Sequence, residues 1–424
     1  MEIEMRRVGK CPSFAALALL VLASLLTACG SSSRAGNIQR KDLFAVGYGM
    51  SENQIDFSAQ GRNGIDLTMG KGIFHLLDGG SRKVMRLSSY GDLLALFFDP
   101  SISPLPGIVK PLSLSDGDAS GDEGPTVAGR YAVPVTFTQP SRIAVGLDQT
   151  IYIADKVAEA SFRIYDVHLA SYCDRIIRRF GSMGVEEAYI GQEGPGGSPF
   201  PAIMSMEVFS DDSLGVLSAT ESAFLVHHFD REGNLLSSLH IGREALPVPS
   251  ELSGFEGNAR VDAKTEGAWN STRIHANLDS MIMASEGASF RLILKLDFYR
   301  EYYDSASLAI SMNEYAGSWI FAMDGWTGHI ENSLPIAPAG AEGPSPELIG
   351  LYSRLYYLLY PATEDDTSWE VRLMNLDGKV QSRVRIEAPE GTREMITIKV
   401  SEEGLVYALL KMDENVQVSL WDVE

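Results

Sequence analysis

Short apolar runs bounded by turn residues recur along the chain between residues 73 and 410. Each run has four or five residues, which is too short for a helix and typical of a buried strand. The runs are Ile73-Phe74-His75-Leu76-Leu77, Ile151-Tyr152-Ile153-Ala154, Gly215-Val216-Leu217-Ser218, Met281-Ile282-Met283-Ala284, Tyr356-Tyr357-Leu358-Leu359 and Val406-Tyr407-Ala408-Leu409-Leu410. The pattern predicts an all-β protein in which each run is the second strand of a repeated unit.

Each unit continues with a third strand, a tight turn and a final strand. The turn is clearest at 229–234 and 375–379, with a looser copy at 89–92, and its glycine permits the positive φ that such turns need. Four-stranded units repeated in this way are typical of propeller blades. The sequence therefore predicts a six-bladed β-propeller, with a seventh blade left open as an alternative.

The spacing between units exceeds the 40 to 50 residues of ordinary propeller repeats. Four segments rich in Gly, Pro, Ser and acidic residues account for the excess, and we expect them to be loops at one end of the blades. They are 99–131, 182–200, 243–272 and 333–346.

The last unit contains only three strands, 395–400, 405–411 and 416–422, before the chain stops. A closed ring leaves no free sheet edge, and it usually pairs the two ends of the chain within one blade. The strand-like segment 43–48 is the candidate for the missing fourth strand.

A β-sandwich pair is the alternative fold. Its strands would alternate apolar and polar residues, because one face of each sheet stays in contact with water. The run Leu355-Tyr356-Tyr357-Leu358-Leu359-Tyr360 does not alternate, so it indicates a strand that is buried on both faces, as between neighbouring blades.

The N-terminal segment has the organisation of an export signal. Arg6, Arg7 and Lys10 precede thirteen uncharged residues, 14–26, and a bilayer-spanning helix would need about 20. Leu26-Thr27-Ala28-Cys29 follows and resembles the lipobox of bacterial lipoproteins. The resemblance implies cleavage before Cys29, attachment of a diacylglycerol to its sulfur, and export to the cell membrane or outer membrane. An uncleaved membrane anchor followed by a plain cysteine is the alternative.

This interpretation divides the chain into three parts. Residues 1–28 are the signal peptide, 29–40 a lipidated flexible tether, and 41–424 the propeller. Stable attachment needs two or more acyl chains, because a single chain binds a bilayer only marginally. Lipoproteins as a family carry that number.

One stretch resembles a known propeller repeat. Residues 140–145, 151–155 and 175–181 are similar to the NHL repeat, and 200–242 is a second copy that lacks the Tyr-x-Ala-Asp signature. Together with the lipobox and the long insertions, these repeats resemble the propeller lipoproteins of spirochaetes. That family has no assigned activity, so the resemblance implies a fold and a location.

Charge and cysteine content narrow the possible partners. The formal net charge is −21, and residues 1–28 contribute +1, so the part from Cys29 onwards carries −22. Such a surface repels nucleic acid and anionic headgroups, and we therefore expect attachment through lipid and no nucleic-acid partner. Cys173 would be the one free thiol left, and we expect it to be partly buried and inert.

Local catalytic or metal-binding motifs are weak in this sequence. The run 116–122 resembles a calcium loop, but Val127 occupies the position of the bidentate glutamate. His227 and His228 are neighbours on a predicted strand, so their rings should point to opposite faces. The aromatic clusters Phe298, Tyr299, Tyr302, Tyr303 and Trp319, Phe321, Trp326 suggest blade packing more than ligand stacking.

These observations favour a membrane-anchored scaffold that binds an envelope protein or another ligand. We assign no catalytic, metal-binding or cofactor-binding residue, and Cys29 is the one candidate modification site. A propeller hydrolase or lyase acting on an envelope or extracellular glycan is the alternative. A propeller can assemble such a site from residues that are far apart in sequence.

Overall fold

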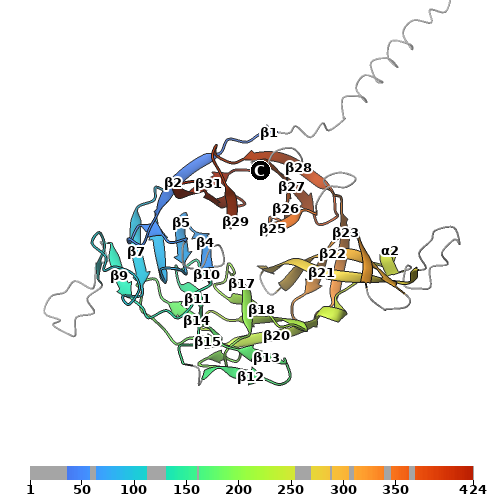
Figure 1. Cartoon of the computed structure of the whole chain (residues 1–424), viewed down its shortest axis with the longest axis horizontal. Helices are drawn as coiled ribbons and strands as arrows, with labels where there is room; N and C mark the ends of the chain where they lie inside the picture. The colour runs from blue at the N-terminus through green and yellow to red at the C-terminus, as the bar shows by residue number, and fades with distance from the viewer. Residues whose placement is uncertain are drawn as a thin grey trace, which may run out of the picture.

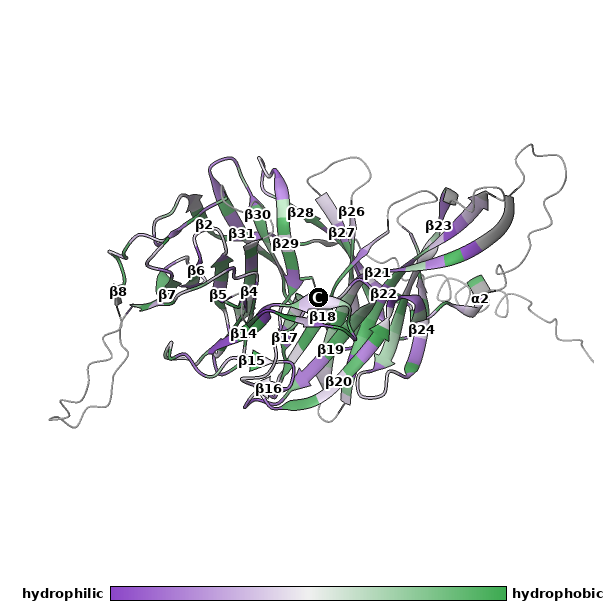
Figure 2. Ribbon diagram, turned by 60° about the horizontal axis from the view of Figure 1, so that its bottom comes forward, coloured by the Kyte–Doolittle hydropathy of each residue, from purple (hydrophilic) through white to green (hydrophobic). Residues whose placement is uncertain are grey.

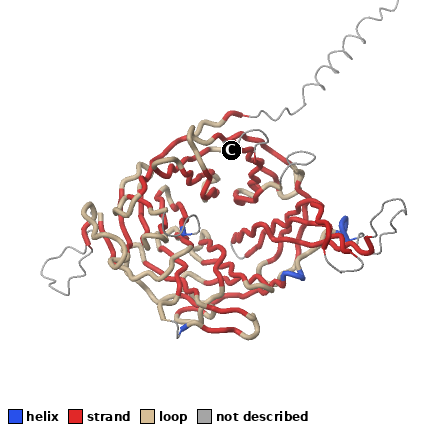
Figure 3. The backbone as a smooth tube through the Cα atoms, viewed as in Figure 1, coloured by secondary structure: helices blue, strands red, loops and turns tan. Residues whose placement is uncertain are grey.

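Six sheets, whose four inner strands run antiparallel, surround a central channel in the computed structural model (Figure 1). The structure describes residues 36–57, 64–111, 130–159, 162–253, 269–286, 289–304, 310–338, 345–361 and 368–423. The predicted six-bladed all-β propeller is confirmed. Figure 3 shows that strands and their connections make up almost the whole ring. Two short helical segments, η3 (Arg243–Ala245) and α2 (Ser250–Ser253), lie after blade 3.

Blades 1 to 3 follow one another along the chain, each written here from the channel outwards. Blade 1 consists of β4 (Ile65–Gly70), β5 (Ile73–Asp78), β6 (Lys83–Leu87), β7 (Leu93–Phe98), β9 (Tyr131–Pro134) and β8 (Lys110–Pro111). Blade 2 consists of β10 (Arg142–Val145), β11 (Ile151–Lys156), β14 (Arg175–Phe180), β15 (Ile190–Gly191) and β16 (Gly194–Pro195). Blade 3 consists of β17 (Ala202–Val208), β18 (Leu214–Ala219), β19 (Ala223–Phe229) and β20 (Leu235–Gly242).

Blades 4 to 6 complete the ring. Blade 4 consists of β21 (Trp269–Glu286), β22 (Ser289–Asp304), β23 (Ile310–Asp324) and β24 (Ile330–Ile336). Blade 5 consists of β25 (Glu347–Tyr352), β26 (Leu355–Pro361), β27 (Ser368–Asn375), β28 (Val380–Glu387) and β1 (Gly36–Asn37). Blade 6 consists of β29 (Glu394–Val400), β30 (Val406–Lys411), β31 (Asn415–Trp421), β2 (Lys41–Tyr48) and β3 (Gln54–Ile55).

The ring closes by pairing the two ends of the chain, as the sequence predicts. Strand β2 pairs antiparallel with β31, with Phe44 opposite Val418 and Val46 opposite Val416. All four side chains are buried in the cluster shared by blades 6 and 1. The first and last segments of the propeller therefore share one blade and one hydrophobic core.

One buried apolar cluster lies at each of the six junctions between blades, which explains the absence of alternation along the strands. Figure 2 colours the ribbon by hydropathy and shows hydrophobic stretches along the strands. Strand β26 illustrates the arrangement. Tyr357 and Leu359 pack toward blade 6, whereas Tyr356 and Leu358 pack toward blade 4. Burial on both faces, predicted from this run, is confirmed.

One expected second strand is assigned differently in the structure. Met281–Ala284 lies in β21, the innermost strand of blade 4, and the second strand is β22. Both strands are buried on two faces, so an apolar run of four residues looks the same in either. The long insertion before this blade removed the regular spacing that would have distinguished them.

The four expected loops also contain strands. Segment 182–200 contains β15 and β16, and the other three contain β8, the first residues of β21 and the last residues of β24. Short backbone ladders form there despite the Gly and Pro content. Strands β8, β15, β16 and β24 pair at the outer parts of blades, whereas the first residues of β21 extend the innermost strand of blade 4. The predicted tight turns are confirmed, with φ of +84° at Gly91, +89° at Gly233 and +80° at Gly378 before the fourth strands of blades 1, 3 and 5.

Candidate functional site

The innermost strands of the six blades enclose a cavity of about 670 Å³ in the central channel. Its wall combines aliphatic side chains with a small number of ionisable ones from different blades. The ionisable side chains are Asp66, Arg142, Glu207, Tyr352, Lys399, Glu402 and Tyr407. A cavity of this size, whose wall combines apolar side chains with convergent polar ones, is a candidate ligand site.

An ion pair crosses the wall of this cavity between blades 6 and 1. Lys399 Nζ donates to Asp66 Oδ1 at 2.7 Å, and Asp66 Oδ2 accepts the backbone N–H of Ile143 at 3.1 Å. Burial disfavours the charged lysine, but the Asp66 carboxylate outweighs burial and raises the pKa of Lys399. The pair therefore presents fixed, opposite charges to the channel.

Glu207 on β17 supplies a second carboxyl group, and its environment differs. Burial raises the pKa of Glu207 to about 8, although the nearby Lys399 acts in the opposite direction. At neutral pH this group is mostly a neutral carboxylic acid that can donate a hydrogen bond. Two residues earlier, the buried Ser205 hydroxyl has no hydrogen-bond partner among the described residues.

Arg142 on β10 gives the channel a further positive charge. Its Nε donates to the Met204 carbonyl at 2.8 Å and its Nη1 to the Ser141 carbonyl at 2.9 Å. These bonds leave part of the guanidinium facing the cavity. In the described part of the chain, no group of three His, Cys, Asp or Glu side chains is arranged to hold a metal ion.

The two neighbouring histidines pack on opposite faces of β19, as predicted. The His227 ring meets Phe200 edge-on at 5.2 Å between centroids, whereas His228 stacks on Phe290 at 4.4 Å. Burial lowers the pKa of His227 to about 4. Both rings are therefore part of the packing between blades.

Cys173 ends β13 (Ser171–Cys173) and is 1% exposed. Burial raises the pKa of its thiol to about 11, with Asp166 and Asp174 adding to the effect. A thiol in this state is a poor nucleophile. The structure therefore places Cys173 in the interior, away from the channel.

The aromatic clusters divide into core and surface. Phe298, Trp319 and Phe321 are buried between blades 3 and 4. Tyr299 and Tyr315 lie along the long strands β22 and β23 with their rings 5.8 Å apart. The expectation of packing is confirmed for the buried three.

A polar cluster inside blade 4 was not among the predicted features. Lys295 Nζ lies 2.8 Å from Asp297 Oδ1, 3.2 Å from Asp279 Oδ2 and 2.5 Å from Ser345 Oγ. Because two carboxylates flank the ammonium, ion pairing accounts for the cluster, which links blade 4 to the residue stretch before β25. The alternation of Lys295 and Asp297 with Leu294 and Leu296 is the signal that could have indicated it.

A hairpin on blade 2 carries an exposed apolar surface. Strands β12 (Ile164–Asp166) and β13 connect β11 to β14, and we call residues 162–173 the rim hairpin. Its exposed side chains are 44 to 74% accessible and comprise Phe162, Ile164, Tyr165, Val167 and Tyr172. The Arg163 guanidinium lies 4.0 Å from the centre of the Tyr172 ring.

Two expected features lie outside the described residues. These are Cys29 with its preceding segment, and the acidic run 116–122 with Val127. Among the helices that the structure describes, none has the length and apolar character needed to cross a membrane.

Comparisons with known proteins identify no family. No protein-family profile matches the chain, and no curated protein matches it. Among solved structures, a protein of unknown function from Bacteroides caccae aligns over 82% of this chain and 82% of its own, with 8% identity and a TM-score of 0.33.

Proposed function

We propose that this chain is an exported lipoprotein, anchored through lipid on Cys29, whose propeller binds another protein of the cell envelope. The rim hairpin is the observation that carries the binding part of the proposal. Exposed apolar clusters of this kind are uncommon on monomeric proteins and are typical of interaction sites. Tyrosine and arginine, which stand together at its centre, are enriched among residues that dominate binding energy.

The anchoring part rests on the sequence alone. The order of charged, apolar and small residues before Cys29, and the polar Gly30-Ser31-Ser32-Ser33 after it, support lipidation. The NHL-like stretch 140–181 supplies β10, β11 and β14 of blade 2. The propeller would then present the rim hairpin to a partner.

Anchoring is tested by labelling cells with a fatty acid. The wild-type protein should incorporate the label, and Cys29→Ser should remain an unlabelled, full-length precursor because the acylated sulfur is absent. Normal labelling of Cys29→Ser would contradict the anchor.

Binding is tested by purifying the lipoprotein from its own membranes. Tyr165→Ser combined with Val167→Ser should lose a stoichiometric partner that the wild type retains. Tyr90→Ser is the matched control, because Tyr90 is 86% exposed on a turn of blade 1. Equal recovery of the partner in all three proteins would exclude the rim hairpin.

Glycan cleavage in the channel is a second candidate function, and Glu207 is the observation that favours it. Glycosidases use a pair of carboxyl groups, one of them a protonated acid, and here Glu207, which burial keeps protonated at neutral pH, shares the cavity wall with Asp66. Release of reducing ends from envelope polysaccharide should then disappear in Glu207→Gln and persist in the exposed control Glu403→Gln. No release by the wild type would eliminate this candidate.

A further inference from the structure

The point where the chain joins the propeller lies on the outer edge of blade 5. Gly36 and Asn37 form β1, which pairs in parallel with β28 opposite Val384 and Arg385. Figure 1 shows β1, β28 and β2 together at one side of the ring, with β12 and β13 at the opposite side. The chain thus enters the propeller at its rim and not at either mouth of the channel.

Residues after β1 hold this edge in place. Ile38 packs against the apolar cluster between blades 5 and 6, and Arg40 Nη1 donates to the Glu387 carbonyl at 3.2 Å. The part of the expected tether that the structure describes, residues 36–40, therefore follows the blade surface before β2 begins at Lys41.

The remaining tether is short. Seven residue steps separate Cys29 from Gly36. At about 3.3 to 3.6 Å per extended residue, this segment spans at most about 25 Å. Lipid on Cys29 would therefore hold the outer edge of blade 5 within about 25 Å of the bilayer surface.

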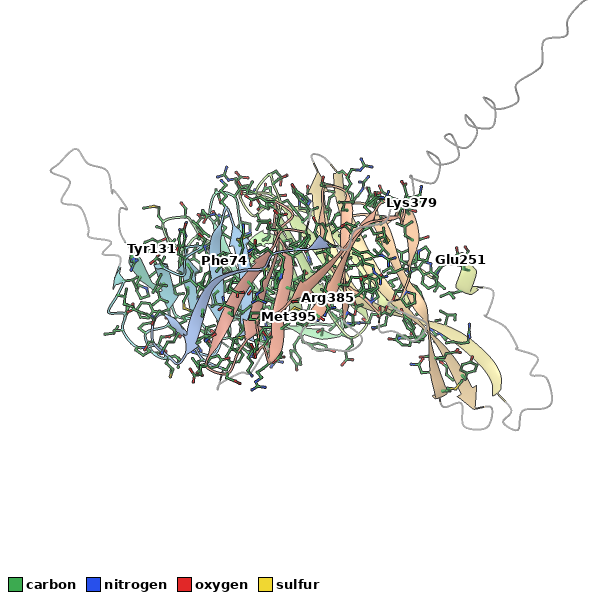
Figure 4. All side chains as sticks on the ribbon, turned by 90° about the horizontal axis from the view of Figure 1, so that it is seen from above. Phe74, Tyr131, Glu251, Lys379, Arg385 and Met395 are labelled. Carbon is green, nitrogen blue, oxygen red and sulfur yellow. The ribbon has the colours of Figure 1, made fainter. Side chains whose placement is uncertain are left out.

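The charge of this edge differs from that of the whole protein. Segments 36–42 and 379–387, which we call the tether rim, carry five basic and two acidic residues in a chain whose net charge is −21. Both acids have basic partners, since Arg40 Nε lies 2.8 Å from Asp42 and Arg385 Nε lies 3.4 Å from Glu387. Figure 4 looks onto this rim and labels Lys379 and Arg385.

Two of the basic side chains remain available to an anionic surface. Lys379 and Arg383 are exposed, and neither forms an ion pair with another described residue. Basic residues beside a lipid anchor are attracted to anionic headgroups, and the attraction disappears beyond a Debye length of about 8 to 10 Å. The acidic remainder of the surface is repelled by the same headgroups.

We propose that the tether rim lies against the anionic bilayer surface, so that the propeller stands on its edge. The proposal rests on the lipid anchor proposed above, which attaches the protein, whereas the tether rim sets its orientation. In this orientation the axis of the channel runs parallel to the membrane plane, so neither mouth faces the membrane. The rim hairpin, on the opposite side of the ring, points away from the membrane.

The test uses the full lipoprotein in vesicles of phosphatidylcholine and phosphatidylglycerol that contain headgroup-quencher lipid. A fluorophore is placed on Gln381→Cys in the tether rim or on Val167→Cys in the rim hairpin, both in a Cys173→Ser background. The Gln381 probe should be quenched about threefold more than the Val167 probe, because quenching requires contact with the headgroup region. Equal quenching, or stronger quenching at Val167, would overturn the orientation.

Charge reversal separates attraction from tether geometry. Lys379→Glu with Arg383→Glu should lower quenching at Gln381, whereas Lys71→Glu with Arg354→Glu, the same charge change at exposed turns near the channel, should not. An equal loss in both variants would contradict a role for the tether rim. Flotation with the vesicles reports anchoring separately: floating protein with equal quenching overturns the orientation alone, and protein that fails to float overturns the anchor and the orientation with it.

Discussion

Lys399 Nζ lies 2.7 Å from Asp66 Oδ1, although the two residues are 333 positions apart in the chain. Lys399 belongs to β29, the innermost strand of the last blade, and Asp66 to β4, the innermost strand of the first. The ion pair therefore joins the inner strands of blades 6 and 1, whereas β2 and β31 close the ring further out, within blade 6. The ring is therefore closed by backbone hydrogen bonds between β2 and β31 in blade 6 and by the Lys399–Asp66 ion pair at the channel wall.

Removing Lys399 should destabilise the propeller because it leaves the Asp66 carboxylate without its cation. We expect Lys399→Met to lower the free energy of unfolding by about 1 to 3 kcal/mol. Asp66→Asn should cost more than Lys399→Met, since Asp66 also accepts the N–H groups of Leu67 and Ile143. Denaturant unfolding of both variants and of the double variant measures the coupling.

The control for this pair is Arg393→Met. Arg393 and Asp413 form an ion pair at 2.7 Å with side chains 64 and 65% exposed, and such pairs contribute at most about 1 kcal/mol. A loss in Lys399→Met no larger than in Arg393→Met would show that the channel pair has no special role in closure.

Glu207 should make stability depend on pH in a defined window. Its pKa rises from an ordinary 4.5 to about 8, so the native state keeps a proton that the unfolded state has lost. The contribution of Glu207 to the free energy of unfolding is fully present below about pH 4.5 and is lost as pH rises through about 8. The Tm of Glu207→Gln should therefore rise relative to that of the wild type as pH increases from 5 to 9.

The exposed Glu403→Gln is the charge-matched control for this experiment. Thermal unfolding across the pH range should give parallel curves for it and the wild type. If the Tm of Glu207→Gln also followed that of the wild type across the pH range, Glu207 would have to be ionised at neutral pH in the folded protein. That result would remove the support for acid catalysis as well.

The strands and the closure could be predicted from sequence because both leave local signals. Apolar runs bounded by turns identify strands buried on two faces, and the segment 43–48 has the same character as the strands it joins. The sequence could not show which strand of blade 4 is innermost, since β21 and β22 are equally apolar. Its long insertion removes the spacing that places the other blades.

The channel site had no local signal at all. Asp66, Arg142, Glu207 and Lys399 come from four blades, and each is one acid or base among many in the sequence. Only the ring brings them to one cavity wall. The rim hairpin was also invisible, because Tyr165 and Tyr172 look like ordinary strand residues until their exposure is known.

The Cys173 thiol should be unreactive in the folded protein. It is 1% exposed and its pKa is raised to about 11, so at pH 8 it is protonated and inaccessible. In a background with both Cys11→Ser and Cys29→Ser, Cys173 is the one remaining cysteine, and a thiol reagent should react only after denaturant is added. Val167→Cys in the same background places a thiol at an exposed position of the rim hairpin and should react at once. Rapid reaction of the protein that lacks this substitution, in the absence of denaturant, would place Cys173 at the surface.

Deleting residues 395–424 should prevent folding, because it removes three strands of blade 6, leaves β2 without its partner β31, and exposes the apolar face of blade 5 that packs against blade 6. Deleting 36–48 is a more selective test, since it removes β1 and β2 and leaves β31 as an open edge. Removing 112–126, a stretch outside the described residues, should cost little, because loop closure changes by only about 0.6 kcal/mol per doubling of length. Near- and far-ultraviolet circular dichroism with thermal melting distinguishes the three deletion variants.

A 36–48 deletion that melted like the parent would mean that pairing of the chain ends is dispensable. The closed ring would then depend on contacts between blades alone.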